Sequence, residues 1–194
     1  MKDEKWPWVQ RAEGWKTKLL VSLLRVSFNF LVMTPLSLYV LSMGLNHQIK
    51  YAMAVDDLPS AWTLAWQILF CVYVEDVGFS IAHRLLHTPF LYKYVHKVHH
   101  QYTQTISIAA IHTHPVEFFI GNVIPAVLPT AILGSGVHVV TVWAWTSVRI
   151  AGTIANHSGY DLPWLPWDLM PMRSTPEYHD FHHSGGDFSG NFSG

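Results

Sequence analysis

Long stretches without a charged residue alternate with short polar segments along this chain. The first runs from 26 to 49 without Asp, Glu, Lys or Arg. As a helix it would be about 36 Å long, enough to cross a hydrocarbon core of roughly 30 Å. The second, from 60 to 74, reaches spanning length only by continuing through Glu75 and Asp76 to residue 82. We therefore expect those two carboxylates near the edge of a membrane.

A third uncharged run extends from 118 to 148 and contains several helix-breaking residues. One helix of that length would measure about 46 Å, too long for a single crossing. Pro125, Pro129 and the sequence GSG at 134–136 interrupt it. They predict two helices joined by a tight turn, at 118–133 and 137–155. The pattern as a whole predicts an all-α integral membrane protein with about four transmembrane helices in two hairpins.

Composition agrees with a membrane protein. Half of the 194 residues are hydrophobic and only 13% are charged, a low share for a soluble domain. With a net charge of −1, the chain lacks the excess of positive charge that is typical of nucleic-acid-binding proteins. We expect an N-terminal segment at 1–25 followed by one membrane-embedded domain at 26–194, truncated at its Gly- and Ser-rich C-terminal end. Membrane lipids are its expected surroundings.

The distribution of Lys and Arg predicts the orientation. Residues 1–25 hold six of them, residues 46–60 hold only Lys50, and residues 84–112 hold three. Such residues favour the cytoplasmic side when they flank membrane spans. The N-terminal segment and the histidine-rich segments are therefore expected to face the cytoplasm.

Histidines form the strongest chemical signal. Nine of the thirteen fall in four short stretches. HRLLH contains His83 and His87, HKVHH contains His96, His99 and His100, NHSG contains His157, and HDFHH contains His179, His182 and His183. Helical spacing would let each triplet converge on a single point, and the two triplets could meet over one centre.

So many imidazoles beside apolar spans would be costly to bury without a ligand, because each ring needs polar partners. Metal binding satisfies them, and nine nitrogens suit two ions better than one. Imidazole suits zinc, copper, iron or nickel; zinc would indicate hydrolysis or a structural role, whereas iron would allow O₂ activation. No HExxH, GxSxG or P-loop motif occurs.

Five motifs in a fixed order carry a family resemblance. They are HRLLH (83–87), YKYVHKVHH (92–100), HPVE (114–117), NHSGYDLPW (156–164) and EYHDFHH (177–183). Over roughly residues 60–194 the chain resembles the fatty acid hydroxylase and sterol desaturase superfamily of membrane di-iron enzymes. NHSGYDLPW together with EYHDFHHSGGDFSGNF most resembles the 4-methylsterol monooxygenases, or sterol C-4 methyl oxidases.

The resemblance implies a di-iron centre held by all nine of these histidines, in a cytoplasmic cap. It also implies O₂-dependent, stepwise oxidation of a sterol C-4 methyl group during sterol biosynthesis in the endoplasmic reticulum. Electrons would come from NAD(P)H through cytochrome b5 and its reductase. The chain has no GxGxxG fingerprint and no HPGG stretch, so a separate electron donor is required.

The sequence departs from the family pattern at three points. Gln101 stands where an acidic residue is common, and His112 stands where an aromatic residue is common before the HP dipeptide. The chain also ends at Gly194, where family members usually continue with an aromatic-rich segment.

Five further residues are candidates for supporting the ligands: Asp76, Asp161, Asp180, His114 and Glu117. Asp76 lies seven positions before His83 and would share its helix face. Asp76 could equally be an interfacial carboxylate, and Asp180 could serve only solvation. His114 and Glu117 could cap a helix or form a turn.

Other functions remain open. A C-5 sterol desaturase or another lipid hydroxylase would use the same metal centre. An inactive paralogue serving as a membrane structural subunit would keep the fold and bind zinc or no metal. For a sterol substrate we expect a long apolar pocket between the spans, with a polar group near the metals to orient the hydroxyl.

Overall fold

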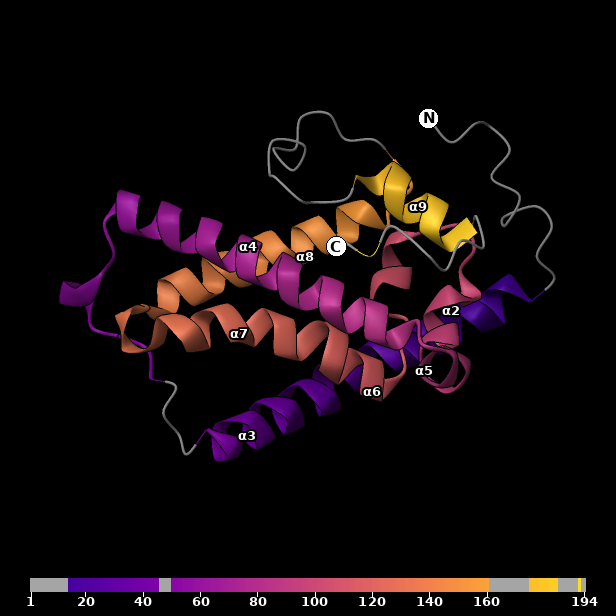
Figure 1. Ribbon diagram of the computed structural model, residues 1–194, viewed down its shortest axis with the longest axis horizontal. Coiled ribbons are helices and arrows are strands. Elements are labelled where there is room, and N and C mark those ends of the chain that lie inside the picture. The colour runs from indigo at the N-terminus through magenta and orange to yellow at the C-terminus, as the bar shows by residue number, and fades with distance from the viewer. Residues whose placement is uncertain (1–13, 46–49, 161–174, 185–191, 193–194) are drawn as a thin grey trace.

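The computed structural model describes residues 14–45, 50–160, 175–184 and 192, and these are helical with no named strand. An isolated parallel bridge pairs Ala52 with His138. The all-α expectation is confirmed for the described chain. Figure 1 shows long helices lying side by side, with short helices gathered at one end of the bundle.

The first long helix is built from α2 (Trp15–Phe28), a π-helical turn η1 (Asn29–Met33) and α3 (Thr34–Gly44). It begins well before the uncharged run, and Lys18 in its first turn has partners at the histidine end. The Lys18 ammonium donates to the Gln101 carbonyl and lies 3.9 Å from the centroid of the Tyr102 ring. A long cationic side chain can thus lie along apolar surface while its head reaches a polar group.

The second long helix, α4 (Ala61–Leu86), begins at Ser60, whose hydroxyl accepts a hydrogen bond from the Thr63 backbone at 3.1 Å. Glu75 and Asp76 are buried near the middle of this helix. Both lie within the stretch Ala61–Leu86 that is long and apolar enough to cross a membrane, and their position relative to the membrane edge stays a prediction. Glu75 forms an ion pair with Arg149 of α8 inside the bundle, a partner that the count of uncharged residues could not reveal.

The third apolar run folds as predicted into two helices. One consists of α6 (Pro115–Glu117), a π-helical turn η5 (Phe118–Val123) and α7 (Ile124–Leu133). A turn at Gly134–Gly136 (η6) joins it to α8 (Val139–Asn156). Gly134 has a φ of 63°, which glycine adopts readily. The glycine turn therefore permits the reversal that makes the hairpin.

The described residues contain three helical stretches long and apolar enough to cross a membrane. They are Trp15–Gly44, Ala61–Leu86 and Pro115–Gly136. The fourth helix of the bundle, α8, contains a buried arginine and is not among them. Trp145 of α8 packs with Cys71 and Val72 of α4 in the core, so α8 belongs to the same bundle.

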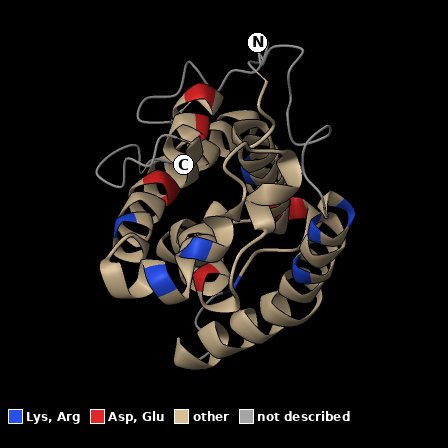
Figure 2. Cartoon of the chain, turned by 90° about the vertical axis from the view of Figure 1, so that its right-hand side faces the viewer, with Lys and Arg blue, Asp and Glu red and all other residues tan. Residues whose placement is uncertain are grey.

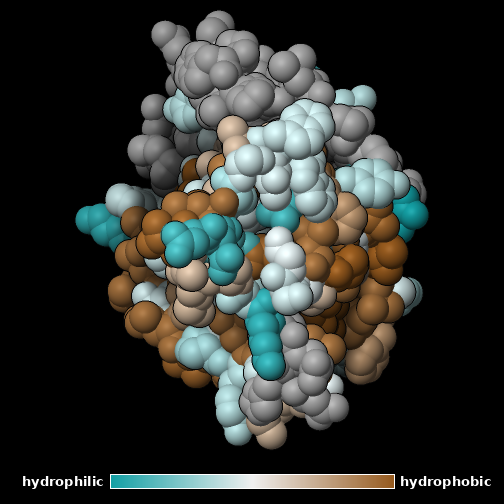
Figure 3. All heavy atoms as spheres, turned by 90° about the vertical axis from the view of Figure 1, so that its left-hand side faces the viewer, coloured by the Kyte–Doolittle hydropathy of each residue, from teal (hydrophilic) through white to brown (hydrophobic). Residues whose placement is uncertain are grey.

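The two ends of the bundle differ. Around η2 (Val55–Asp57) and the start of α4, hydrophilic side chains lie among exposed hydrophobic ones such as Val55 and Leu58, and hydrophobic side chains form the flanks (Figure 3). At the opposite end, Lys and Arg gather where α2 begins (Figure 2). The short helices α5 (Pro89–Tyr94), η3 (His96–Gln101), η4 (Ser107–Ile111) and α9 (Pro176–Ser184) form a cap at this end.

Candidate metal centre

The structure brings all nine sequence-predicted histidines together at the capped end, in two groups. In each group the ring nitrogens lie within 4.8 Å of one another. The five-histidine group contains His83, His87, His96, His100 and His182, and the four-histidine group contains His99, His157, His179 and His183.

The five-histidine group combines α4, η3 and α9. His83 and His87 face the same side of α4, with ring centroids 4.9 Å apart. Nε2 of His87 lies 3.0 Å from Nε2 of His96 and 3.0 Å from Nε2 of His182. Nε2 of His100 lies 3.1 Å from Nε2 of His96. Ring nitrogens from three segments therefore meet around one point.

The four-histidine group combines η3, the C-terminal end of α8, and α9. Nε2 of His179 lies 2.8 Å from Nε2 of His157 and 3.1 Å from Nε2 of His183. Nε2 of His99 lies 3.4 Å from Nε2 of His157. All four side chains are buried.

These separations fit nitrogens that share an ion. Two nitrogens each about 2.1 Å from one ion are about 3.0 Å apart at a right angle and about 3.4 Å apart at the tetrahedral angle. The nearest-neighbour separations given above run from 2.8 to 3.4 Å, and all the nitrogens of a group lie within 4.8 Å of one another. In addition, Nε2 of His83 is buried and has no hydrogen-bond partner among the described residues. The donor set therefore fits a metal ion in each group.

The far side of several rings is anchored by hydrogen bonds. Nδ1 of His157 donates to the Thr153 carbonyl at 2.9 Å, and Nδ1 of His183 donates to the Tyr102 carbonyl at 2.9 Å. A proton held on Nδ1 leaves the Nε2 lone pair directed into the group.

In the five-histidine group the anchors include a carboxylate. Nδ1 of His96 lies 2.8 Å from Oε1 of Glu117, and both side chains are buried. Nδ1 of His83 lies 3.1 Å from the Phe192 carbonyl. These contacts again leave Nε2 of each ring facing the group, as a metal ligand requires.

The rings are held in the neutral form that binds metal. Burial, with the neighbouring His182, lowers the pKa of His87 to about 4. Burial and the adjacent rings lower the pKa of His100 to about 3. Burial also lowers the pKa of His157 to about 4. At neutral pH each ring therefore offers a lone pair without first losing a proton.

Each histidine triplet is divided between the two groups, so the expected convergence of each on a single point is wrong. His96 and His99 belong to a 3₁₀-helix, in which positions three apart lie one above the other about 6 Å along the axis. Their rings accordingly stack, with centroids 5.5 Å apart and planes at 28°. His99 belongs to the four-histidine group, and in the α-helix α9 the middle histidine, His182, is likewise the one that joins the other group.

The groups are neighbours. The rings of His100 and His183 stack across the boundary between them, with centroids 4.7 Å apart and planes at 28°. In α9, His179 and His183 face one group while His182 faces the other. Both η3 and α9 therefore supply rings to both groups.

The candidate supporting residues have different positions. Glu117 contacts His96 as described, whereas His114 accepts a hydrogen bond from the Val116 backbone at 3.2 Å and caps α6. Asp180 accepts a hydrogen bond from the Thr105 hydroxyl at 3.0 Å and so ties α9 to the loop between η3 and η4. Asp76 is buried in α4. Asp161 lies outside the described residues.

Two positions that depart from the family pattern contact each other. Nε2 of His112 donates to Oε1 of Gln101 at 3.0 Å. Burial, reinforced by the positive charges of Arg25 and Lys18, lowers the pKa of His112 to about 4. His112 is therefore neutral, and a neutral amide acceptor suits its single N–H.

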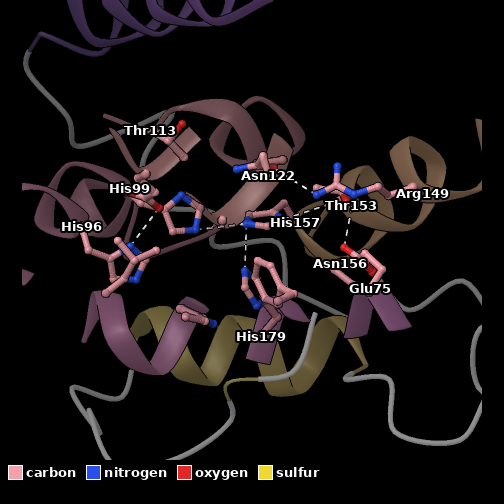
Figure 4. Close-up of a pocket in the computed structure, with 16 residues that line it drawn as sticks. Glu75, His96, His99, Thr113, Asn122, Arg149, Thr153, Asn156, His157 and His179 are labelled. Carbon is pink, nitrogen blue, oxygen red and sulfur yellow. Dashed lines mark hydrogen bonds and ion pairs between the residues drawn. The ribbon is translucent and has the colours of Figure 1, made fainter. Parts of the chain in front are cut away.

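The histidines border a small chamber that adjoins a much larger apolar cavity. The chamber is about 40 Å³ and includes His83, His99 and His157 in its wall. The cavity is about 570 Å³ and lies between the first helix, η5, α7 and α8. The two share four lining residues: Ala110, Asn122, Arg149 and Thr153. Figure 4 shows Arg149, Asn122 and Thr153 beside His157.

Sequence reasoning missed Arg149 and Asn122. The available signal was an arginine within an otherwise uncharged helix, since ionisable residues inside membrane spans commonly mark functional sites.

Comparison with known proteins assigns the family. The sequence model of the family described as fatty acid hydroxylase matches residues 68–194. The chain belongs to the fatty acid hydroxylase family. This confirms the resemblance found in the sequence.

Curated relatives in this family act on different lipids, by their names. Methylsterol monooxygenase 1 of Gallus gallus is 37% identical over 147 residues, covering 71% of this chain and 45% of the relative. Its namesake in Rattus norvegicus is 38% identical with the same coverage. Very-long-chain aldehyde decarbonylase GL1-11 of Oryza sativa subsp. indica is 36% identical over 126 residues, covering 65% of this chain and 46% of the relative. The chain spans about half the length of these relatives. No solved structure matches it.

Proposed function

We propose that the chain is the core of a di-iron monooxygenase of the endoplasmic reticulum membrane, which oxidises a sterol C-4 methyl group stepwise towards a carboxylate. The observation that carries the proposal is the pair of adjacent histidine groups bordering a large apolar cavity. Iron bound by the nine histidines would supply the O₂ activation that an unactivated methyl group requires.

The residues of the chain would bind and orient the lipid. A volume of about 570 Å³ falls in the range of roughly 300–1,000 Å³ typical of small-molecule sites. Leu38, Val127 and Ile150 are among the apolar residues that line it. Such walls would favour the rigid, apolar body of a sterol and exclude water from the methyl group to be oxidised.

Electrons would be delivered from outside the chain. Each hydroxylation consumes O₂, two electrons and two protons, and releases one water molecule. We assign delivery to cytochrome b5 and its reductase, with NAD(P)H as the source. The donor would approach the capped end, where the histidines lie and where Lys and Arg gather. By the positive-inside tendency this end faces the cytoplasm.

Reconstitution tests the activity. A chain of the relatives' full length, supplied with cytochrome b5, its reductase and a 4-methylsterol, should yield the 4-hydroxymethyl sterol and then the 4-carboxy sterol. A new ring double bond would instead indicate a C-5 desaturase, and an oxidised acyl chain would indicate a lipid hydroxylase. Conversion of a very-long-chain aldehyde alone would move the assignment to the decarbonylases. Bound zinc without O₂ consumption would favour the structural subunit.

Cysteine labelling tests the orientation. Lys97 and Ser184 are exposed at the capped end, and Asp57 is exposed at the opposite end. Single cysteines at Lys97 and Ser184 should react with an impermeant reagent from the cytoplasmic side of sealed vesicles, whereas one at Asp57 should be protected. The native Cys71 is fully buried and serves as the background control. The reverse pattern would invert the proposed topology.

A further inference from the structure

A buried polar cluster separates the apolar cavity from the histidines. Arg149 of α8 is 8% exposed and Glu75 of α4 is 4% exposed. Nε of Arg149 donates to Oε1 of Glu75 at 3.2 Å, and Nη2 of Arg149 donates to Oδ1 of Asn122 at 3.4 Å (Figure 4). These three residues are called the collar below.

The charges of the collar are not required for the stability of the bundle. Burying an ion pair in an apolar bundle carries a desolvation penalty that the attraction between the charges often only offsets. Of the described residues that line the large cavity, Arg149 is the only charged one. Hydrophobic residues of similar volume would pack the same space without that penalty. A role in binding a molecule in the cavity would account for the presence of the Arg149–Glu75 ion pair.

The collar lies on the route from the cavity to the histidines. Arg149 and Asn122 line both spaces. Arg149, Thr153 and His157 follow one another at intervals of four, so they lie along one side of α8 and its C-terminal cap. Thr153 anchors the His157 ring through its carbonyl. From Arg149 to His157 the helix rises by about 12 Å.

The guanidinium retains unused donors. An arginine side chain has five N–H donors in a planar fork. The described contacts of Arg149 use Nε and one N–H of Nη2, and no described residue accepts from Nη1. The remaining donors can serve an oxygen atom of a molecule in the cavity.

We propose that the collar binds the single oxygen function of an otherwise apolar lipid and thereby sets which carbon faces the histidines. This inference rests on the proposed function and deepens it. For a sterol, the ring hydroxyl would sit against Arg149 and Asn122 while the methyl group on the adjacent ring carbon points into the chamber. A carboxylate formed by oxidation would meet the same guanidinium in a charge-assisted contact.

Binding measurements test the collar without relying on turnover. The probes are a 4-methylsterol and its 3-deoxy analogue, which differ only in the hydroxyl. The purified full chain should bind the hydroxylated sterol about 10- to 100-fold more tightly, as expected for a hydrogen bond to a charged donor. The Arg149→Met/Glu75→Gln double variant removes both charges together and should bind the two probes equally. Its affinity for the 3-deoxy analogue should match that of the parent, which also reports correct folding.

Two further variants keep the test decisive. Arg149→Lys retains the ion pair but replaces the planar fork by one ammonium group, and should reduce the preference for the hydroxyl at least several-fold even where the double variant does not fold. Trp143→Phe changes an exposed residue of α8 that lines neither space, and should leave the preference unchanged. An undiminished preference in Arg149→Lys and in the double variant would overturn the proposal.

A second probe pair separates the collar from the identity of the substrate. A very-long-chain aldehyde and the matching alkane also differ by one oxygen function. If sterols do not bind but the aldehyde is preferred, and Arg149→Lys reduces that preference, the collar stands and the sterol assignment fails. If a 4-methylsterol is oxidised and the collar variants keep the parent's preference, the proposed function stands and the collar fails. Equal binding within both pairs by the parent also overturns the collar.

Discussion

The two histidine groups share η3 and α9 yet differ in the number, burial and anchoring of their rings. The four-histidine group is buried throughout, whereas His87 and His100 of the five-histidine group are only partly buried. Glu117 places a carboxylate behind a ring of the larger group, while His157 and His183 of the smaller group rest on backbone carbonyls. An ion in the larger group would thus have one additional ligand and a carboxyl group behind one of its ligands. We infer that the two positions are chemically unequal.

The largest predicted effect is a difference in bound metal between alanine variants of two adjacent histidines. His99 belongs to the smaller group and His100 to the larger. His99→Ala leaves three rings, so bound metal should fall to half or less and turnover should be lost. His100→Ala leaves four rings and should retain more metal. Metal content per chain, measured on purified protein with O₂ consumption, checks both.

His138→Ser provides the control for these substitutions. His138 caps α8 at the far end of the bundle, and serine also caps well. This variant should keep the metal content and activity of the parent. Full metal and activity in His99→Ala, or equal losses in the two alanine variants, would break the distinction between the groups.

A smaller effect should follow from replacing the carboxyl group of Glu117. Glu117→Gln preserves size and an acceptor for His96 but removes the carboxyl group behind it. Loss of such outer contacts typically weakens metal binding about 10- to 100-fold. We expect that loss in the five-histidine group alone, seen as one weakened component in a chelator competition titration. Glu177→Gln, the same change at an exposed residue of α9, should leave both components unchanged. Equal weakening of both components would contradict the assignment of Glu117 to one group.

The smallest effect concerns Gln101 and His112, which lie behind the four-histidine group beside Tyr102. Their hydrogen bond should contribute about 1 kcal/mol to the free energy of unfolding. Unfolding in detergent of Gln101→Ala, His112→Ala and the double variant gives this coupling directly. Additive single effects would show that the contact contributes nothing.

Local signals in the sequence predicted most of the elements. GSG at 134–136 ends one helix and begins a hairpin because glycine permits the reversed backbone locally. The nine histidines could be identified because they cluster within short segments. In contrast, Arg149 and Glu75 are 74 positions apart, and Lys18 and Gln101 are 83 apart. Neither pairing has a local signature.

The division of the triplets could not be predicted for a different reason. HKVHH forms a 3₁₀-helix and HDFHH an α-helix, yet in both triplets the first and third histidines join one group and the middle one joins the other. Residues Pro89–Tyr94 begin as an α-helix and the chain then tightens at His96–Gln101. Spacing alone places the histidines of each triplet near one face, whereas their division depends on where the other segments of the fold present their rings.

The sharing of η3 and α9 between the groups has a consequence for maturation. An ion captured in one group would fix backbone that also presents rings to the other, so the first capture should raise the affinity for the second. Loading is then expected to follow a sigmoidal isotherm, with few molecules holding a single ion. Scarcity of metal in the cell would accordingly reduce the number of complete centres rather than leave many half-filled.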